Sequence, residues 1–509
     1  MVLEMVRTSF LSRALRLRLS LGLSLGLSPR LSPRLSLGLS LGLSLALCLT
    51  FSLALGACAL IIPAADTPDQ ARDYAEKATA YGLPLLLMEQ TRQSSQSNLR
   101  DRAGITPQAN TFFHARQLVS SRGRVVIRPN NDTLYSTAWL DLSKGPVRLD
   151  VPVIRDRYWI MPLMDAWTNV FATVGSRTHA AMVGKEATSW WILGSAQRDQ
   201  VPAGAQLIES PTDMVWIIGR IELRGAGDLA MVRAVQDGFT LSPALPAENL
   251  PANAVRELPP RIVSQLPATE FFERLAQLMA RQKPLPQDDL ALAVLRGLGV
   301  TAGKPFPARS EPASAAWLAA VEEGKKNAFD KLANAGFTRR APEAVGASNG
   351  WNMNNSPDIG RFGSNYALRA GIAMAGLGAL PLADAWYPST ELDGNLQPLH
   401  GARKYQLHFE AKQLPPAQAF WSLTLYDQGG YFVDNPLNRY ALTDRDALRF
   451  NDDGSLDLYI GGIAPADSKW QANWLPAPDA AFNLSLRIYD PTAPAIAGKW
   501  LPPPITRSP

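Results

Sequence analysis

The 509-residue chain has only two cysteines and four histidines. Both cysteines, Cys48 and Cys58, lie near the N-terminus, so the rest of the chain can form no disulfide and must be stabilised by core packing alone. The histidines show neither the His-x-His nor the His-Glu-x-x-His spacing that is typical of zinc sites. The sequence therefore predicts no cofactor. A divalent metal ion remains an alternative only if distant segments of the chain assemble its site.

The chain also lacks an excess of positive charge once its first 57 residues are set aside. The formal net charge is +5, but residues 1–57 contain six arginines and one glutamate. The remaining residues include 44 basic and 44 acidic side chains. A nucleic-acid-binding surface needs a local excess of basic residues, and the short basic patches here are followed by acidic ones. We therefore expect no nucleic-acid partner.

The first 57 residues have the composition of an export signal. Arginines in a low-complexity Leu-Ser-Leu-Gly repeat precede an uncharged apolar run from Leu35 to Ile62. Within it, Leu55-Gly56-Ala57-Cys58 resembles a bacterial lipobox, whose cysteine is acylated. The sequence predicts a lipoprotein anchored through Cys58, in the periplasm or at the periplasmic face of the outer membrane. Cleavage to a soluble periplasmic protein and an uncleaved anchor, for which the run is long enough, remain alternatives.

The hydrophobic pattern predicts an α+β fold that is mainly β. A helix is expected over residues 67–98, and short strand-like runs separated by Pro, Gly, Asn and Asp occupy 124–223. Helical periodicity returns over 230–340, and the β pattern resumes at residue 404. The predicted parts are a leader over 1–57, an N-terminal β-rich domain with a leading helix over 66–225, a helical linker region over 226–345, and a C-terminal β-sandwich domain with an entry helix over 346–509.

Several long motifs resemble a known pair of bacterial families. Those resembling domain-of-unknown-function family 1254 are Arg128–Ser136, Asp165–Ala172 and Gly175–Thr178. Those resembling its usual C-terminal partner, family 1214, include Phe420–Asp427 and Asp434–Tyr440. The resemblance implies exported proteins with two β-sandwich, jelly-roll-like halves. It implies no particular activity, and no catalytic residues follow from it.

The segment from Arg128 to Ser136 is the strongest candidate for a site. In one interpretation Asn131 and Asp132 only satisfy the amides of a tight turn. In the other, Arg128, Asp132 and Tyr135 face a cleft. The arginine then binds an anion through its planar fork, and the aspartate acts as an acid/base or as a ligand anchor.

A second candidate follows in the chain. Asp165, Trp167 and Asn169 alternate, so on a strand they share one face and resemble a sugar- or ring-binding surface. The same residues suit a buried polar cluster equally well. Arg177 and His179 come next and are expected to close the same pocket.

These residues give a leading hypothesis and two alternatives. The leading hypothesis is a polar small-molecule or glycan-like ligand bound in a cleft of the N-terminal β domain, with the ligand-binding residues Arg128, Asn131, Tyr135, Trp167, Asn169, Arg177 and, at the pocket mouth, Arg439. In the first alternative the protein is a hydrolase or lyase with Asp132 or His179 as catalytic acid/base and Arg128 or Arg177 stabilising an anion. In the second it is a structural envelope protein. The oligomeric state is left open.

Overall fold

The computed structural model of the protein describes residues 62–103, 108–122, 127–178, 188–246, 257–310, 312–334 and 348–508. Two predicted residues, Cys58 and His179, lie outside these ranges, as does the predicted leader. Among the helices of the described ranges, none is both long enough and apolar enough to cross a membrane.

The fold is α+β, as predicted, although the emphasis on β structure was too strong. Helices hold slightly more of the described residues than strands do. One reason is α3 (Pro68–Ala103), a 36-residue helix that continues through Pro84. The short connections include the 3₁₀ turns η1 (Leu142–Lys144), η2 (Arg198–Gln200), η3 (Ala226–Asp228), η4 (Pro286–Asp288) and η5 (Ser468–Asn473).

The N-terminal β domain consists of two sheets that face each other across a shared core. The first sheet has the order β1 (Phe113–His114), β2 (Thr133–Asp141), β8 (Met214–Glu222), β4 (Trp159–Asp165), β5 (Val170–Gly175). The second has the order β7 (Gln206–Ser210), β6 (Thr188–Gly194), β3 (Val147–Val151), β9 (Thr240–Ser242). Alternate residues such as Leu140, Leu149 and Ile217 fill the space between them. Helix α5 (Leu229–Asp237) and β9 belong to this domain, which therefore extends beyond the predicted boundary at residue 225.

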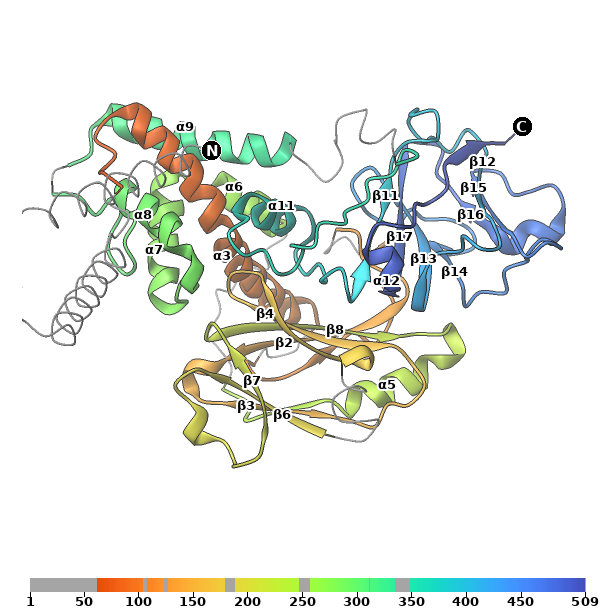
Figure 1. The fold of residues 1–509 in the computed structure, drawn as a ribbon, viewed down its shortest axis with the longest axis horizontal. Coiled ribbons are helices and arrows are strands. Elements are labelled where there is room, and N and C mark those ends of the chain that lie inside the picture. The colour runs from red at the N-terminus through yellow and green to blue at the C-terminus, as the bar shows by residue number, and fades with distance from the viewer. Residues whose placement is uncertain are drawn as a thin grey trace, which may run out of the picture. The chain divides into compact units, whose positions relative to one another are not determined.

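Helices gather around α3 and form a layer of their own (Figure 1). They are α6 (Pro259–Gln265), α7 (Ala268–Arg281), α8 (Asp289–Leu298), α9 (Ala315–Asn334) and α11 (Tyr366–Gly376). A Cβ at Gly324 of α9 would collide with the Arg72 carbonyl of α3, so glycine permits the close approach of these two helices. The predicted linker is thus a packed layer. The predicted leading helix α3 and entry helix α11 belong to it rather than to the β domains.

The C-terminal β domain repeats the two-sheet arrangement. One sheet has the order β10 (Ala385–Trp386), β17 (Phe482–Pro491), β13 (Ala417–Asp427), β14 (Ala441–Thr443), with β11 (Ser389–Thr390) also paired to β17. The other has the order β16 (Trp474–Pro476), β15 (Leu456–Gly461), β12 (Tyr405–Phe409), β18 (Ile505–Arg507), and α12 (Ala493–Ile496) follows β17. The pairs β6–β7 and β15–β16 are parallel, whereas a jelly roll is antiparallel throughout.

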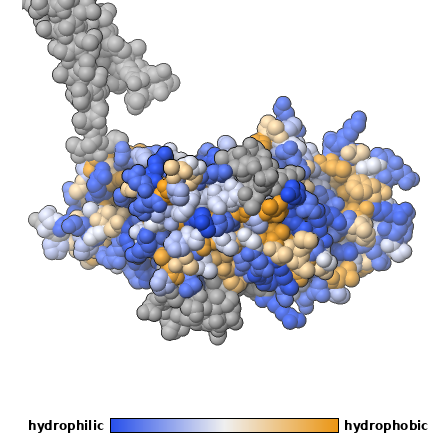
Figure 2. Space-filling model, turned by 90° about the horizontal axis from the view of Figure 1, so that it is seen from below, coloured by the Kyte–Doolittle hydropathy of each residue, from blue (hydrophilic) through white to orange (hydrophobic). Residues whose placement is uncertain are grey.

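The two β domains contact each other through β4 and the sheet of β13 and β17. A small hydrophobic cluster marks this contact and includes Ile160, Phe420 and Tyr489. On the face shown in Figure 2, hydrophobic residues form several separate patches among hydrophilic ones. Large apolar side chains that are exposed singly, such as Met231 and Ile463, are ordinary on a protein surface.

Candidate functional site

The predicted pocket residues lie in separate places and do not line one cleft. Arg128, Asp132 and Tyr135 lie at the contact between the two β domains, whereas Trp167 and Asn169 lie against the helical layer. Arg177 and Arg439 each bind a different partner. The shared cleft predicted in the N-terminal domain is therefore not formed by this set.

Trp167 and Asn169 are buried structural residues of the turn between β4 and β5. The Asp165 carboxylate accepts hydrogen bonds from the backbone N–H groups of Trp167 and Asn169, at 2.9 Å each. Thr168 has a φ of +71°, so the segment is a tight turn and its residues do not alternate as on a strand. The Trp167 ring is fully buried, and its Nε1 donates to the Lys283 carbonyl at 2.9 Å. Burial raises the pKa of Asp165 to about 6, against the lowering effect of its hydrogen bonds to Asn169.

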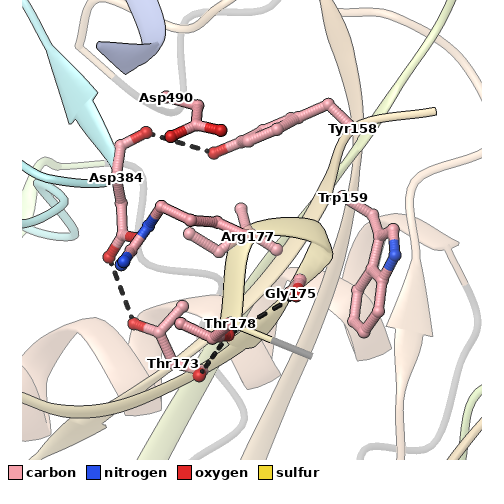
Figure 3. Close-up of a pocket in the computed structure, with 9 residues that line it drawn as sticks. Tyr158, Trp159, Thr173, Gly175, Arg177, Thr178, Asp384 and Asp490 are labelled. Carbon is pink, nitrogen blue, oxygen red and sulfur yellow. Dashed lines mark hydrogen bonds and ion pairs between the residues drawn. The ribbon is translucent and has the colours of Figure 1, made fainter. Parts of the chain in front are cut away.

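Arg177 forms an ion pair with Asp384, which lies just before β10 (Figure 3). The Asp384 carboxylate also accepts a hydrogen bond from Thr173 Oγ1 at 3.2 Å, and its carbonyl accepts one from Tyr158 Oη at 3.3 Å. The hollow among these side chains has about 0 Å³ open to water. Arg177 is thus engaged in joining the two β domains, and this hollow has no room for a ligand.

Arg439 braces a loop of the C-terminal domain. Its Nη1 donates to the carbonyls of Gln471 and Trp474, at 2.8 and 2.9 Å. These contacts give the residue a local structural role, and the structure does not bring it together with the other predicted residues.

Asp132 also joins the two β domains. Its side chain is buried, with one oxygen accepting from Ser422 Oγ at 2.7 Å and the other 3.3 Å from Arg445 Nη2. Arg445 lies 3.6 Å from Glu222 as well, and its guanidinium covers the Phe420 ring at 3.9 Å. The Asp132 carboxylate is therefore already paired with Arg445, and this contact is a structural ion pair.

The turn before β2 is organised by Asn130, a residue that the sequence analysis passed over. Its Oδ1 accepts from the backbone N–H groups of Asp132 and Thr133, at 3.1 and 3.0 Å. Its Nδ2 donates to Tyr135 Oη at 2.9 Å. Asn131 is only half-buried. The predicted turn is present, and it fixes the position of the Tyr135 ring.

Tyr135 belongs to a group of arginines and tyrosines between the β domains, which we call the junction site: Arg128, Tyr135, Arg220, Tyr387 and Arg487. The Arg220 guanidinium of β8 lies 5.5 Å from the Tyr135 ring centre, and Arg487 of β17 lies 5.5 Å from that of Tyr387. Arg220 donates to the carbonyls of Ile218 and Gly378, at 3.0 and 2.9 Å. These contacts hold both guanidiniums against tyrosine faces.

Arg128 is fixed to the C-terminal domain through its backbone. Its N–H donates to the Gly430 carbonyl at 2.8 Å, and its own carbonyl accepts from Arg487 Nη2 at 2.8 Å. The φ of Arg128 is +52°, a conformation that these two contacts hold in place. Burial lowers the pKa of the Arg128 guanidinium, and the positive charge of Arg487 lowers it further.

The C-terminal wall of the junction site is a polar sheet face. Because side chains alternate along a strand, Ser422, Thr424 and Tyr426 of β13 share a face with Ser485 and Arg487 of β17, their neighbours in register. Arg487 Nη2 also donates to Tyr426 Oη at 2.7 Å. In the part of the chain that the structure describes, no partner is found for four buried groups on this face: Thr424 Oγ1, Arg487 Nε and Tyr489 Oη, which can donate, and Asn483 Oδ1, which accepts.

The three arginines of the junction site have no counter-ion of their own. None of Arg128, Arg220 and Arg487 forms an ion pair with a carboxylate of the described residues. Yet Arg220 and Arg487 are 7% and 8% exposed, and an unpaired buried charge is costly. Tyr135 and Tyr387 remain only half-buried beside them. Burial raises the pKa of Tyr387, so its hydroxyl stays protonated at neutral pH.

Among the described residues, no three His, Cys, Asp or Glu side chains lie close enough together to hold a metal ion. His114 is bound to Ser136 Oγ at 2.8 Å, and burial lowers its pKa to about 4. His408 is bound to Asp457 at 2.6 Å, and this hydrogen bond raises its pKa. Both histidines have a local partner.

The sequence analysis missed Arg220, Tyr387 and Arg487. A signal was present, since Arg220 and Arg487 are lone cations inside the apolar strand runs Met214–Leu223 and Phe482–Tyr489. In the second run Asn483, Ser485 and Arg487 alternate with leucines and isoleucine, which indicates a strand with one polar face. Which element covers that face could not be read from the pattern.

The two β domains correspond to two families. Residues 109–243 match the family described as "Protein of unknown function (DUF1254)", and residues 384–493 match "Protein of unknown function (DUF1214)". The chain therefore contains a DUF1254 region followed by a DUF1214 region, the pairing that its motifs indicated. No curated protein matches the chain.

A solved structure shares the fold. The crystal structure of the VPA0106 protein from Vibrio parahaemolyticus is 20% identical, with a TM-score of 0.60 over 86% of this chain and 100% of that one. An uncharacterized protein from Burkholderia cenocepacia is 12% identical over 86% of this chain and 95% of its own, with a TM-score of 0.40. At 20% identity, the first likeness supports the fold alone.

Proposed function

We propose that the protein binds a small anionic ligand at the junction site. The observation that carries this proposal is the set of three arginines, Arg128, Arg220 and Arg487, that have no carboxylate partner among the described residues. Guanidinium groups bind carboxylates and phosphates through paired N–H donors, and such charge-assisted hydrogen bonds are strong. A bound anion would supply the missing negative charge.

The tyrosines of the site support the same ligand. Burial raises the pKa of Tyr387 and of Tyr489, so both phenols act as hydrogen-bond donors. The Tyr489 hydroxyl is fully buried and has no partner among the described residues. Of the polar ligands that the sequence suggested, including glycan-like ones, an acidic compound fits these donors best.

The hydrolase or lyase alternative has less support. Its proposed acid/base, Asp132, accepts hydrogen bonds from Ser422 and Arg445 and is buried, so it has no free edge for a substrate. Arg177, its proposed anion-stabilising residue, is paired with Asp384.

Thermal unfolding tests the binding proposal. The purified protein, dialysed to remove anions, is heated with phosphate, sulfate, succinate or citrate at constant ionic strength. A ligand at a hundredfold excess over its Kd stabilises the folded state by roughly 2.7 kcal/mol. We expect at least one anion to raise the Tm of the wild type, and to leave the Tm of Arg220→Met unchanged.

Arg309→Met is the matched control. Arg309 also lies over an aromatic ring, 4.8 Å from that of Trp317, and donates to a backbone carbonyl, but it belongs to the helical layer. It should respond to anions as the wild type does. Equal stabilisation of all three proteins, or of none of them, would contradict binding at the junction site.

We also propose that the protein is exported and anchored through an acylated Cys58. The basic residues, apolar run and Leu-Gly-Ala-Cys motif of the N-terminus support this proposal. Expression in a bacterial host with a labelled palmitate should label the wild type and leave Cys58→Ala unlabelled. A wild type without label, found soluble in the periplasm, would favour ordinary signal cleavage instead.

A further inference from the structure

We propose that the ligand of the junction site carries at least two negative charges and is held by both β domains at once. This inference rests on the proposed function and specifies the chemical class of the ligand. The class is a small carboxylate or phosphate polyanion.

The three arginines come from both β domains. Arg128 precedes β2 and Arg220 lies in β8, so both belong to the N-terminal domain, whereas Arg487 lies in β17 of the C-terminal domain. Arg487 and Arg128 are near neighbours, because Arg487 Nη2 donates to the Arg128 carbonyl. Like charges from two domains thus meet at one place. An anion between them would remove this repulsion and contact both domains.

Nearby carboxylates do not supply that charge, because the buried ones are already engaged. Asp132 and Glu222 are paired with Arg445, and Glu222 also with Arg224 at 3.0 Å. Asp384 is paired with Arg177. Glu391 is exposed and affects Arg128 only through its charge, without forming an ion pair. A ligand with a single negative charge would therefore leave two arginines unbalanced.

Unused hydrogen-bond donors on the C-terminal wall also favour a ligand with more than one negative charge. Arg487 Nε and Tyr489 Oη belong to side chains that are 8% and 0% exposed, and neither atom has a partner among the described residues. Thr424 Oγ1, on the same sheet face, is a third. A polyanion has enough acceptor oxygens to satisfy these donors together with guanidiniums from the facing domain.

Calorimetric titration with anions of increasing charge tests the inference. The carboxylate probes are butyrate, succinate and citrate, and the phosphate probes are inorganic phosphate and pyrophosphate, all at one ionic strength. We expect succinate to bind at least about tenfold more tightly than butyrate, because a second charge-assisted contact is gained. Comparing the two series separates a carboxylate from a phosphate ligand.

Two variants test whether both domains hold the ligand. Arg220→Met and Arg487→Met should each weaken binding of the best polyanion by about tenfold or more, while Arg309→Met leaves it unchanged. The circular dichroism spectrum and Tm of each variant, measured without anion, verify that it is folded. Should Arg487→Met not fold, Tyr489→Phe, which removes only one hydroxyl of the same wall, serves in its place with an expected loss of about threefold to tenfold.

The outcomes separate the two proposals. If no anion binds, the proposed function is wrong. If butyrate binds as tightly as succinate, the protein is an anion-binding protein but the ligand needs only one charge. If only the Arg220 variant loses affinity, the ligand is held by the N-terminal domain alone, and the inference that both domains hold it is overturned.

Discussion

The outer face of the β2–β8 pair has two ends, and different partners cover them. At one end Trp139 and Trp216 lie opposite each other in register, with their rings stacked at 4.9 Å and covered by the helical layer. At the other end Tyr135 lies opposite Arg220 and faces the C-terminal domain. We call these the tryptophan end and the arginine end.

The difference shows how one sheet face serves two purposes. The polar atoms of the tryptophan end are satisfied: Trp139 Nε1 donates to Ser95 at 3.1 Å and Trp216 Nε1 to Thr137 at 2.8 Å. The helical layer covers the tryptophan end with apolar residues, and the burial of this apolar surface stabilises the fold. At the arginine end, charges and donors lack partners in the described residues. The tryptophan end therefore holds the fold together, and the arginine end is where we propose that an anion binds.

The largest effect is expected at the tryptophan end. Trp216→Ala removes a 9% exposed indole that packs against Trp139 and the helical layer, and should lower the free energy of unfolding by about 3–5 kcal/mol. Urea unfolding measures the loss, which anions should not reverse. The control Met231→Ala, at a 59% exposed side chain, should cost less than about 0.5 kcal/mol. Rescue of the Trp216 variant by anions would mean that the two ends are not independent.

Asp132→Asn tests the ion pair between Asp132 and Arg445, the contact at the arginine end whose charges already balance each other. The variant removes the negative charge from Arg445 while keeping an acceptor for Ser422, and should cost about 3 kcal/mol in the free energy of unfolding. Asp156→Asn, at an exposed carboxylate of the same domain, should change it by less than about 0.5 kcal/mol. A normally stable Asp132→Asn protein that has lost only ligand binding would instead restore Asp132 as a site residue.

Gly430→Ala tests how tightly the C-terminal domain holds Arg128. Gly430 has a φ of +81°, and a Cβ there would lie 2.9 Å from Ile127 Cγ2 and 3.1 Å from Arg128 Cγ. We expect a loss of roughly 2 kcal/mol in the free energy of unfolding, together with weaker anion binding. Gly498→Ala has a similar φ of +72° and no neighbour within 4 Å, so it should cost only about 1 kcal/mol and leave binding unchanged. Equal losses in the two variants would show that the contact with Arg128 is unimportant.

The smallest effect concerns the pH dependence of stability. Burial raises the pKa of Asp444, beside Arg445, to about 6 from an ordinary value of 3.8. The folded state then binds the proton more tightly than the unfolded state does, so this contribution to stability is complete below pH 3.8 and is lost as pH rises through 6. Asp444→Asn should remove this part of the slope between pH 4 and 6. If the slope is unchanged in the variant, the pH dependence comes from the titration of another group, for example Asp165.

The local elements could be predicted from the sequence, because their signals are local. Short strands were expected within residues 124–223 and after residue 404, and these ranges contain β2 and β3, and β15, respectively. Asp165–Asn169 was expected as a strand because its residue types alternate, but the hydrogen bonds of the Asp165 carboxylate turn it into a hairpin turn.

The candidate site could be predicted only in part. The turn at Asn130–Asp132 and the position of Tyr135 follow from neighbouring residues. The partners of these residues come from β13 and β17, about 290 residues away in the chain for Asp132 and Ser422. No local pattern contains that information, so Trp167, Asn169 and Arg177 could not be separated from the true neighbours of Tyr135.

The sequence by itself determined the pairing of a DUF1254 region with a DUF1214 region, the α+β class, most of the strands and the absence of disulfides from residues 59–509. Residue order sets these properties through periodicity, composition and motif. Only the tertiary structure decided which side chains meet: that Asp132 is neutralised by Arg445, that Trp167 is core, and that Arg128, Arg220 and Arg487 gather without a counter-ion among the residues that the structure describes. The physical reason is that a charge is structural or functional according to the partners that folding brings to it, and those partners are distant in the chain.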